Sequence, residues 1–106
     1  MIGGVVELEL ARHQWADGRR ALERSRSDRA RYDTLSSGVE VVQHELSRRL
    51  GQVFTMNELT DCYAASDRWV LELIHDAFPD DSPAESSLIA NAAFDLYARR
   101  ASDYAP

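Results

Sequence analysis

The chain has 106 residues, of which 44% are hydrophobic and 28% charged, and its single cysteine excludes an internal disulfide and a four-thiolate zinc site within one copy. We expect one folded domain, residues 1–106, because a chain of this length buries about two-thirds of the surface that it exposes when unfolded. No apolar run approaches the roughly 20 residues of a membrane span, and the first residues lack a signal-peptide pattern, so we expect a cytoplasmic protein without membrane contact.

The N-terminal part predicts one long helix. Large apolar side chains recur every seven residues, at Leu8, Trp15 and Leu22. The second seam position of the heptad is filled mostly by small residues, namely Ala11, Gly18, Ser25 and Tyr32. This spacing favours a helix over residues 5–33, although the alternation over residues 6–10 also fits a strand. The apolar seam closes either on its own domain or on another chain. Gly18 costs about 1 kcal/mol relative to alanine inside a helix and predicts a bend.

Three sequence patterns of the capping-box type predict the starts of further helices. In such a box a Ser or Thr hydroxyl accepts a bond from the amide three residues on, and a Glu side chain reaches back. The patterns are Ser37-x-x-Glu40, Thr55-x-x-Glu58 and Ser82-x-x-Glu85. The helices that follow them span about residues 38–50, 56–65 and 83–102. Gly51 ends the first of these, and another helix begins after a cap at Ser66 and ends before Pro79.

Together these elements predict an all-α, five-helix, bundle-like domain, in which a long basic N-terminal helix joins an acidic body over about residues 37–103. The net charge is +1 over residues 1–35 and −7 over residues 52–106. Seven arginines lie on the predicted first helix: Arg12, Arg19, Arg20, Arg24, Arg26, Arg29 and Arg31. Guanidinium groups suit acidic protein surfaces or phosphates. Local ion pairs, or contact with the acidic half of the same chain, are the alternatives.

Residues 54–74, FTMNELTDCYAASDRWVLELI, resemble a helix-turn-helix unit. The packing positions of its two helices are Leu59, Tyr63, Val70 and Leu73, and the turn is Ala64-Ala65. The resemblance implies a DNA-binding transcriptional regulator. Ala64 replaces the customary turn glycine, and the second helix displays acidic side chains that phosphates repel. These are Asp67, Glu72 and Asp76, with Arg68 as the one opposing charge.

The candidates for catalysis or metal binding are few. Glu72 and His75 share a helix face, as in di-iron bundles, but one copy supplies too few ligands, so only a homodimer would complete such a site. A surface ion pair is the favoured interpretation. Cys62 follows Asp61, whose charge raises a thiol pKa, and a buried apolar role is favoured over a nucleophilic one. We expect no catalytic residue, cofactor or metal.

The sequence therefore favours a non-enzymatic protein that binds another macromolecule. The partner is another protein, or a second copy of this chain, held by the N-terminal helix. The predicted contact residues are Leu8, Trp15, Arg19, Leu22, Arg26 and Tyr32. Trp15 is either a buried seam residue or an exposed anchor. A DNA-binding regulator is the alternative function, and a metal protein that uses Glu72 and His75 is less favoured.

Overall fold

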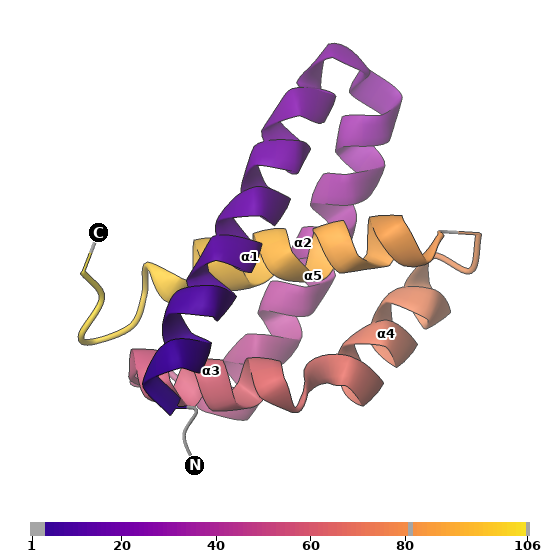
Figure 1. Cartoon of the computed structure of the whole chain (residues 1–106). Coiled ribbons are helices and arrows are strands. Elements are labelled where there is room, and N and C mark those ends of the chain that lie inside the picture. Colours follow the sequence, from indigo (N-terminus) through magenta and orange to yellow (C-terminus); the bar gives the residue numbers. More distant parts are fainter. Residues whose placement is uncertain (1–3, 81, 106) are drawn as a thin grey trace.

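The computed structural model describes the backbone of residues 4–80 and 82–105, and their side chains except those of residues 4–7 and 66–68. Helices make up most of the described chain, in which no strand occurs (Figure 1). They are α1 Gly4–Arg24, the short 3₁₀ turn η1 Ser25–Ser27, α2 Arg29–Leu50, α3 Met56–Ala64, α4 Ser66–Ala77 and α5 Pro83–Ala98. The predicted all-α class with five α-helices is confirmed.

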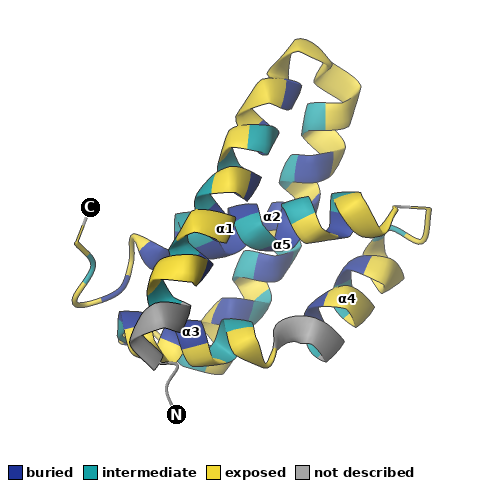
Figure 2. Ribbon diagram, viewed as in Figure 1, coloured by how far each residue is buried: buried dark blue, intermediate teal, exposed yellow. Residues whose placement is uncertain are grey.

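The central element is α5, which all four other α-helices contact. Its buried residues are mostly alanines and large apolar side chains, as expected of a helix that packs in a core, whereas Pro83, Ala84 and Ser87 near its start are exposed. Helices α1 and α2 form a long hairpin that crosses α5, and α3 and α4 lie across the lower end of this hairpin (Figure 1). Buried residues gather where the hairpin meets α5, whereas the far end of the hairpin is exposed (Figure 2).

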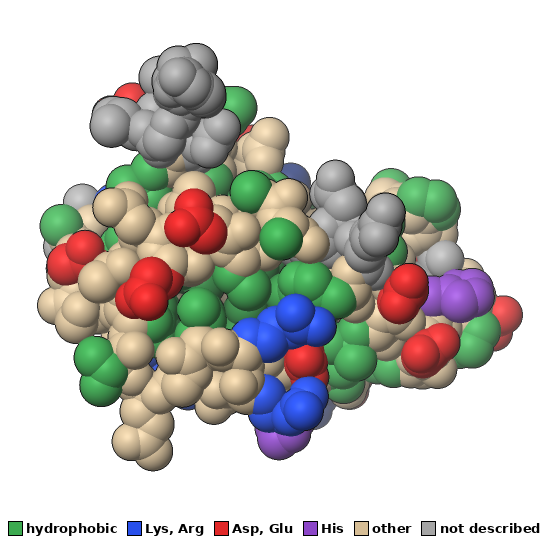
Figure 3. Space-filling view, turned by 90° about the horizontal axis from the view of Figure 1, so that it is seen from below, with side chains coloured by type: hydrophobic (Ala, Val, Ile, Leu, Met, Phe, Trp, Pro, Cys, Tyr) green, Lys and Arg blue, Asp and Glu red, His purple; other side chains and the backbone are tan. Residues whose placement is uncertain are grey.

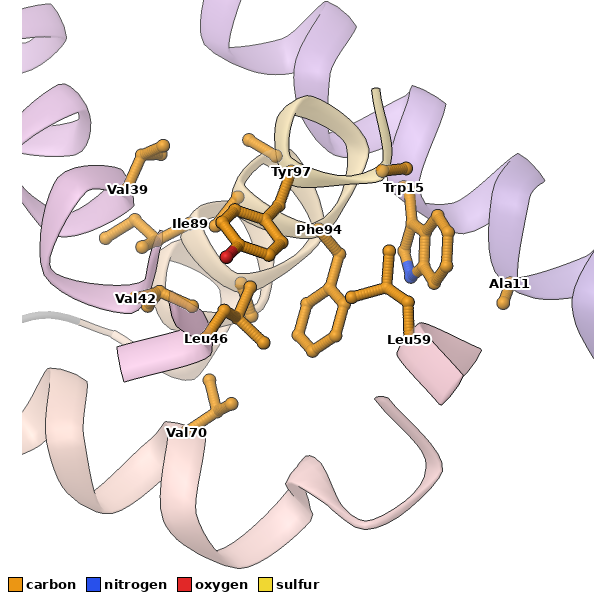
Figure 4. Packing of buried hydrophobic residues seen from close by; sticks show 14 of the residues in the cluster. Ala11, Trp15, Val39, Val42, Leu46, Leu59, Val70, Ile89, Phe94 and Tyr97 are labelled. Carbon is orange, nitrogen blue, oxygen red and sulfur yellow. The ribbon is translucent and has the colours of Figure 1, made fainter. Parts of the chain in front are cut away.

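The apolar seam of α1 closes on the chain's own α5. Ala11, Trp15, Gly18 and Leu22 are all buried, which confirms the helical interpretation over the strand. The Trp15 ring stacks on the fully buried Phe94 ring of α5 at a centroid distance of 5.6 Å (Figure 4). Aromatic pairs in this geometry add stability beyond the area that they bury. The seam therefore serves the internal packing of the domain.

The prediction of one rod over residues 5–33 is wrong, because the chain turns at residues 25–28. The buried Ser25 hydroxyl donates to the carbonyl of Leu22 at 2.6 Å. Asp28 is extended and caps α2, where its side chain accepts a bond from the amide of Arg31 at 3.2 Å. Short polar side chains compete with helical hydrogen bonding in this way. Tyr32 consequently lies on α2 and not on the first helix.

Of the three predicted helix starts, two are confirmed and one is wrong. Thr55 and Glu58 form the complete box: the Thr55 hydroxyl accepts from the Glu58 amide at 3.2 Å, and the Thr55 amide donates to the Glu58 carboxylate at 2.9 Å. Ser82 caps α5 through the predicted amide. Ser37, however, lies exposed in the middle of α2, because the helix has already begun eight residues earlier.

The helix ends and the start of α4 follow the sequence less closely. Gly51 follows α2 with a φ of 75°, in the region that favours glycine, as predicted. Helix α4 ends before Pro79, also as predicted. The predicted Ser66 cap is wrong, because Ser66 is the first helical residue and Ala65 occupies the cap position. The side chain of Ser66 lies outside the described residues.

The last helix ends at Ala98, four residues before its predicted end, because the segment that follows returns to the start of α3. The amide and the hydroxyl of Ser102 donate to the Phe54 carbonyl at 2.9 Å and 3.1 Å. The Asp103 carboxylate accepts a bond from the amide of Met56 at 2.8 Å. The bond to Asp103 satisfies an amide that the beginning of α3 leaves unpaired, and the bonds from Ser102 fasten the C-terminal segment to the residue before the α3 cap.

Two glycines let the hairpin approach α5 closely. A Cβ atom on Gly18 of α1 would lie 2.5 Å from the Cβ of Asn91 and 2.8 Å from the backbone nitrogen of Ala92. A Cβ atom on Gly38 of α2 would lie 2.8 Å from the terminal methyl of Ile89. Gly18 therefore serves close helix packing, and the α-helix continues through it.

The variant Gly18→Ala is expected to lower the free energy of unfolding by about 1–3 kcal/mol, because backbone atoms of α5 cannot yield to the added methyl group. Gly38→Ala should cost less, since the opposing Ile89 methyl can move. Denaturant unfolding monitored by circular dichroism measures both variants. At an open helix position alanine would stabilise the protein by up to about 1 kcal/mol, so a gain for Gly18→Ala would contradict the close crossing.

Candidate functional site

Three adjoining hollows of about 420, 410 and 260 Å³ form one concave surface, which we assign as the candidate site. Gln14 of α1 and Tyr63 of α3 line all three hollows, which makes the surface continuous. We call it the Tyr63 groove. Its lining also includes Leu10, Asp17, Ala64, Leu71, Ala84 and Asn91.

A polar cluster lies in the groove. The Tyr63 hydroxyl is 2.6 Å from Oε1 of Gln14 and 2.7 Å from Oδ1 of Asn91. A phenol has one hydroxyl hydrogen and donates it to one acceptor, so the other amide must turn its NH₂ group toward the phenol oxygen. Because either amide can take either role, the cluster can offer a donor or an acceptor to an occupant.

The rim of the groove is apolar. The described residues include three large hydrophobic side chains that are clearly exposed, and two of them, Leu10 at 55% and Leu71 at 48%, line the groove. Exposed apolar side chains beside a hollow with a few polar groups are typical of binding sites. The third, Val53 at 81%, lies outside the groove and provides a control position.

The six predicted contact residues all lie on the α1–α2 hairpin, but they differ in how far they are buried. Trp15 and Leu22 are buried by the chain's own helices, and Leu8 packs partly buried against the same core. A partner that binds the folded domain therefore does not reach Trp15 or Leu22. Tyr32 packs against the core from α2, and the Arg26 guanidinium stands 5.5 Å over its ring. The six residues do not form one surface.

Several arginines of the first half bind this chain's own carboxylates or carbonyls. Arg19 Nε lies 2.8 Å from Asp95 Oδ2 of α5. Arg12 donates to the carbonyl of Ala105 at 2.8 Å. These contacts fit the alternative in which the basic helix lies against the C-terminal half of its own chain.

The segment that resembles a helix-turn-helix unit forms two helices, α3 and α4, joined at Ala65. The packing positions Leu59 and Val70 are buried, as the resemblance implies. The exposed part of α4 carries Glu72 and Asp76, whereas the side chains of residues 67 and 68 lie outside the described ones. Acidic side chains are spread over the underside of the molecule, and its most prominent basic side chains form one cluster (Figure 3).

Two other sequence candidates can be placed. Glu72 and His75 are both exposed, and the described residues contain no group of three or more His, Cys, Asp or Glu arranged to hold a metal ion.

Cys62 is partly buried, and burial raises the pKa of its thiol. Of the two charges involved, Arg49 lowers that pKa and Glu45 raises it. The predicted direction of the shift is confirmed, but its main cause is burial and not the neighbouring Asp61.

The chain was compared with protein-family models, with curated proteins and with solved structures, and none of the three comparisons finds a match. Across the described residues, no helix combines the length and the apolar character needed to cross a lipid bilayer.

Sequence reasoning did not find the Tyr63 groove. Gln14 and Asn91 lie 49 and 28 residues from Tyr63, and only the crossing of α1 with α5 brings the three together. One signal was present: Leu10, Gln14, Asp17 and Ala21 follow helical spacing on the face beside the buried seam. Leu10 is the one large apolar residue of these four.

Replacing Tyr63 with phenylalanine is expected to lower the free energy of unfolding by about 0.5–1.5 kcal/mol, because the amides of Gln14 and Asn91 lose their common hydroxyl partner. Tyr104→Phe in the C-terminal segment is the matched control and should change stability by less than about 0.5 kcal/mol. Equal stabilities of wild type and Tyr63→Phe in denaturant unfolding would show that the cluster contributes nothing to the fold.

The Cys62 thiol should react with iodoacetamide more slowly than a free cysteine at pH 7.5, because its raised pKa leaves less thiolate at that pH. The rate should rise as the pH increases toward that pKa, and the urea-unfolded chain should react at the ordinary rate. Mass spectrometry follows the labelling. Faster labelling of the folded than of the unfolded chain would contradict the assignment.

Proposed function

We propose that this protein acts by binding and not by catalysis, and that it receives an apolar helical segment of another protein in the Tyr63 groove. The observation that carries this proposal is the continuity of three hollows whose rim bears two of the three exposed large hydrophobic residues of the described chain. Burial of such a rim drives association, and the polar cluster sets the orientation of the occupant.

The shape of the groove favours a helix as its occupant. The line from Leu10 to Ala21 on α1 spans 11 residues, or roughly 16 Å, which is three helical turns. Small residues such as Ala64 and Ala84 line the groove and allow a backbone to approach closely. Asp17 is the one charged residue in the lining, so an apolar segment fits better than a highly charged one.

The proposal retains the N-terminal helix as a binding element but uses another of its faces. The face with Trp15 and Leu22 packs on the domain itself, and the face with Leu10 and Gln14 lines the groove. DNA binding by α4 receives less support, because its described exposed side chains are acidic at Glu72 and lack arginine or lysine.

A photo-crosslinking amino acid at Leu10 or at Leu71 should capture the same protein in cells, whereas the same amino acid at Val53 should not. The adducts from both groove positions should map to one apolar helical segment of the captured protein. A synthetic peptide of that segment should bind the double variant Leu10→Ala, Leu71→Ala about tenfold more weakly, as measured by calorimetry.

The crosslinking result would contradict the proposal if Val53 captured the same proteins as the groove positions. It would also do so if the peptide bound wild type and the double variant equally. Circular dichroism of the variant serves as the folding control, and both leucines are exposed enough to be replaced without a cavity in the core.

A further inference from the structure

The end of the α1–α2 hairpin carries positive charge on an otherwise acidic molecule. Residues 20–31, which we call the hairpin tip, hold five arginines and two acidic residues, for a net charge of +3 in a chain of net charge −6. The rest of the chain is therefore strongly acidic. The tip projects away from the other helices, and all of its residues except Ala21, Leu22 and Ser25 are exposed (Figures 1 and 2).

Two guanidinium groups of the tip remain available. Arg20, Arg29 and Arg31 each lie within 4 Å of a carboxylate of the same chain. Arg24 and Arg26 are both exposed, and no described carboxylate forms an ion pair with either. The Arg26 guanidinium lies 5.5 Å from the centre of the Tyr32 ring and is exposed to solvent there.

A second concave surface lies between α2 and α4 and has the opposite charge. Two adjoining hollows of about 560 and 220 Å³ share Glu45 and Leu73, and we call them together the acidic groove. Its carboxylates are Glu40, Glu45, Glu72 and Asp76, and its apolar floor includes Val41 and Leu73.

Three of the four carboxylates of the acidic groove have no ion-pair partner among the described residues. Glu45 alone is paired, by Arg48 and Arg49, and their hydrogen bonds lower its pKa. The Arg49 guanidinium is also held 4.3 Å from the Trp69 ring, so it is committed within the domain. Within the described part of the chain, Glu40, Glu72 and Asp76 form no ion pair.

The tip and the acidic groove of one molecule cannot meet. The unpaired guanidinium groups belong to Arg24 and Arg26, which precede α2, and from Arg29 to Glu40, the nearest carboxylate of the groove, α2 advances 11 residues, or roughly 16 Å. The charge complementarity between them can therefore be satisfied only between two copies. We propose that the hairpin tip of one copy docks into the acidic groove of another.

Such a contact is head-to-tail, because the two copies use different surfaces. A head-to-tail contact leaves one free tip and one free groove on every pair of copies. Association therefore continues beyond the dimer unless the copies close into a ring. Since the contact depends on exposed charges, it weakens as salt shortens the screening length from about 10 Å at 0.1 M to about 3 Å at 1 M.

Light scattering and sedimentation on the full chain, from 10 µM to 1 mM protein in 20 mM and in 1 M NaCl, test the proposal. The weight-average mass should rise with concentration in low salt and return to the monomer mass in high salt. Two double variants should each remain monomeric, because the tip and the groove then carry charge of the same sign. They are the tip variant Arg24→Glu, Arg26→Glu and the groove variant Glu72→Arg, Asp76→Arg. An equimolar mixture of the two variants should associate again, because each tip then meets a groove of opposite charge.

The control variant Asp61→Arg, Asp80→Arg makes the same change in net charge as the groove variant, at exposed positions outside both surfaces, and should associate like wild type. Circular dichroism confirms that every variant is folded. A wild-type chain that stays monomeric at 1 mM in low salt would overturn the proposal. So would a mixture that fails to associate, or association that persists in either single variant. The Tyr63 groove is intact in all these variants, so crosslinking from Leu10 is unaffected by the outcome.

Discussion

The fold depends on the packing of the four other α-helices against α5, and that packing depends on how closely the hairpin can approach. Gly18 and Gly38 bring α1 and α2 onto α5 at distances that leave no room for a side chain at Gly18 and little at Gly38. The close crossing in turn brings Trp15 onto Phe94 and places Gln14 beside Asn91. The candidate site is thus a consequence of the same constraint as the core.

The sequence predicted those elements whose signals are local. The box at Thr55, the cap at Ser82 and the heptad repeat of the first helix each depend on residues a few positions apart, and the structure confirms them. The box at Ser37 failed because a three-residue spacing does not show whether the backbone is already helical there. The early end of α5 was also not predictable, since it depends on hydrogen bonds between Ser102 and the distant Phe54.

The candidate site was less predictable than the fold for the same reason. The heptad repeat correctly identified the apolar face of α1, but a repeat does not identify what covers that face. Once α5 covers Trp15 and Leu22, the surface left for a partner is the neighbouring face with Leu10, which shows no repeat of its own. The Tyr63 hydroxyl and its two amides come from three helices, so no spacing in the sequence connects them.

The length of the hairpin exceeds what the core requires. Between residues 26 and 34 only Tyr32 is partly buried against the core, so this segment adds little apolar burial to the stability of the domain. A shorter connection between Leu22 and Leu35 would keep the same core with less chain to order, which costs conformational entropy. Three arginines of this segment and Arg24 beside it nevertheless place a local positive charge at the end farthest from the acidic α3 and α4 (Figure 1). An extension that adds little to the core but separates opposite charges within one small molecule is better explained by recognition than by stability.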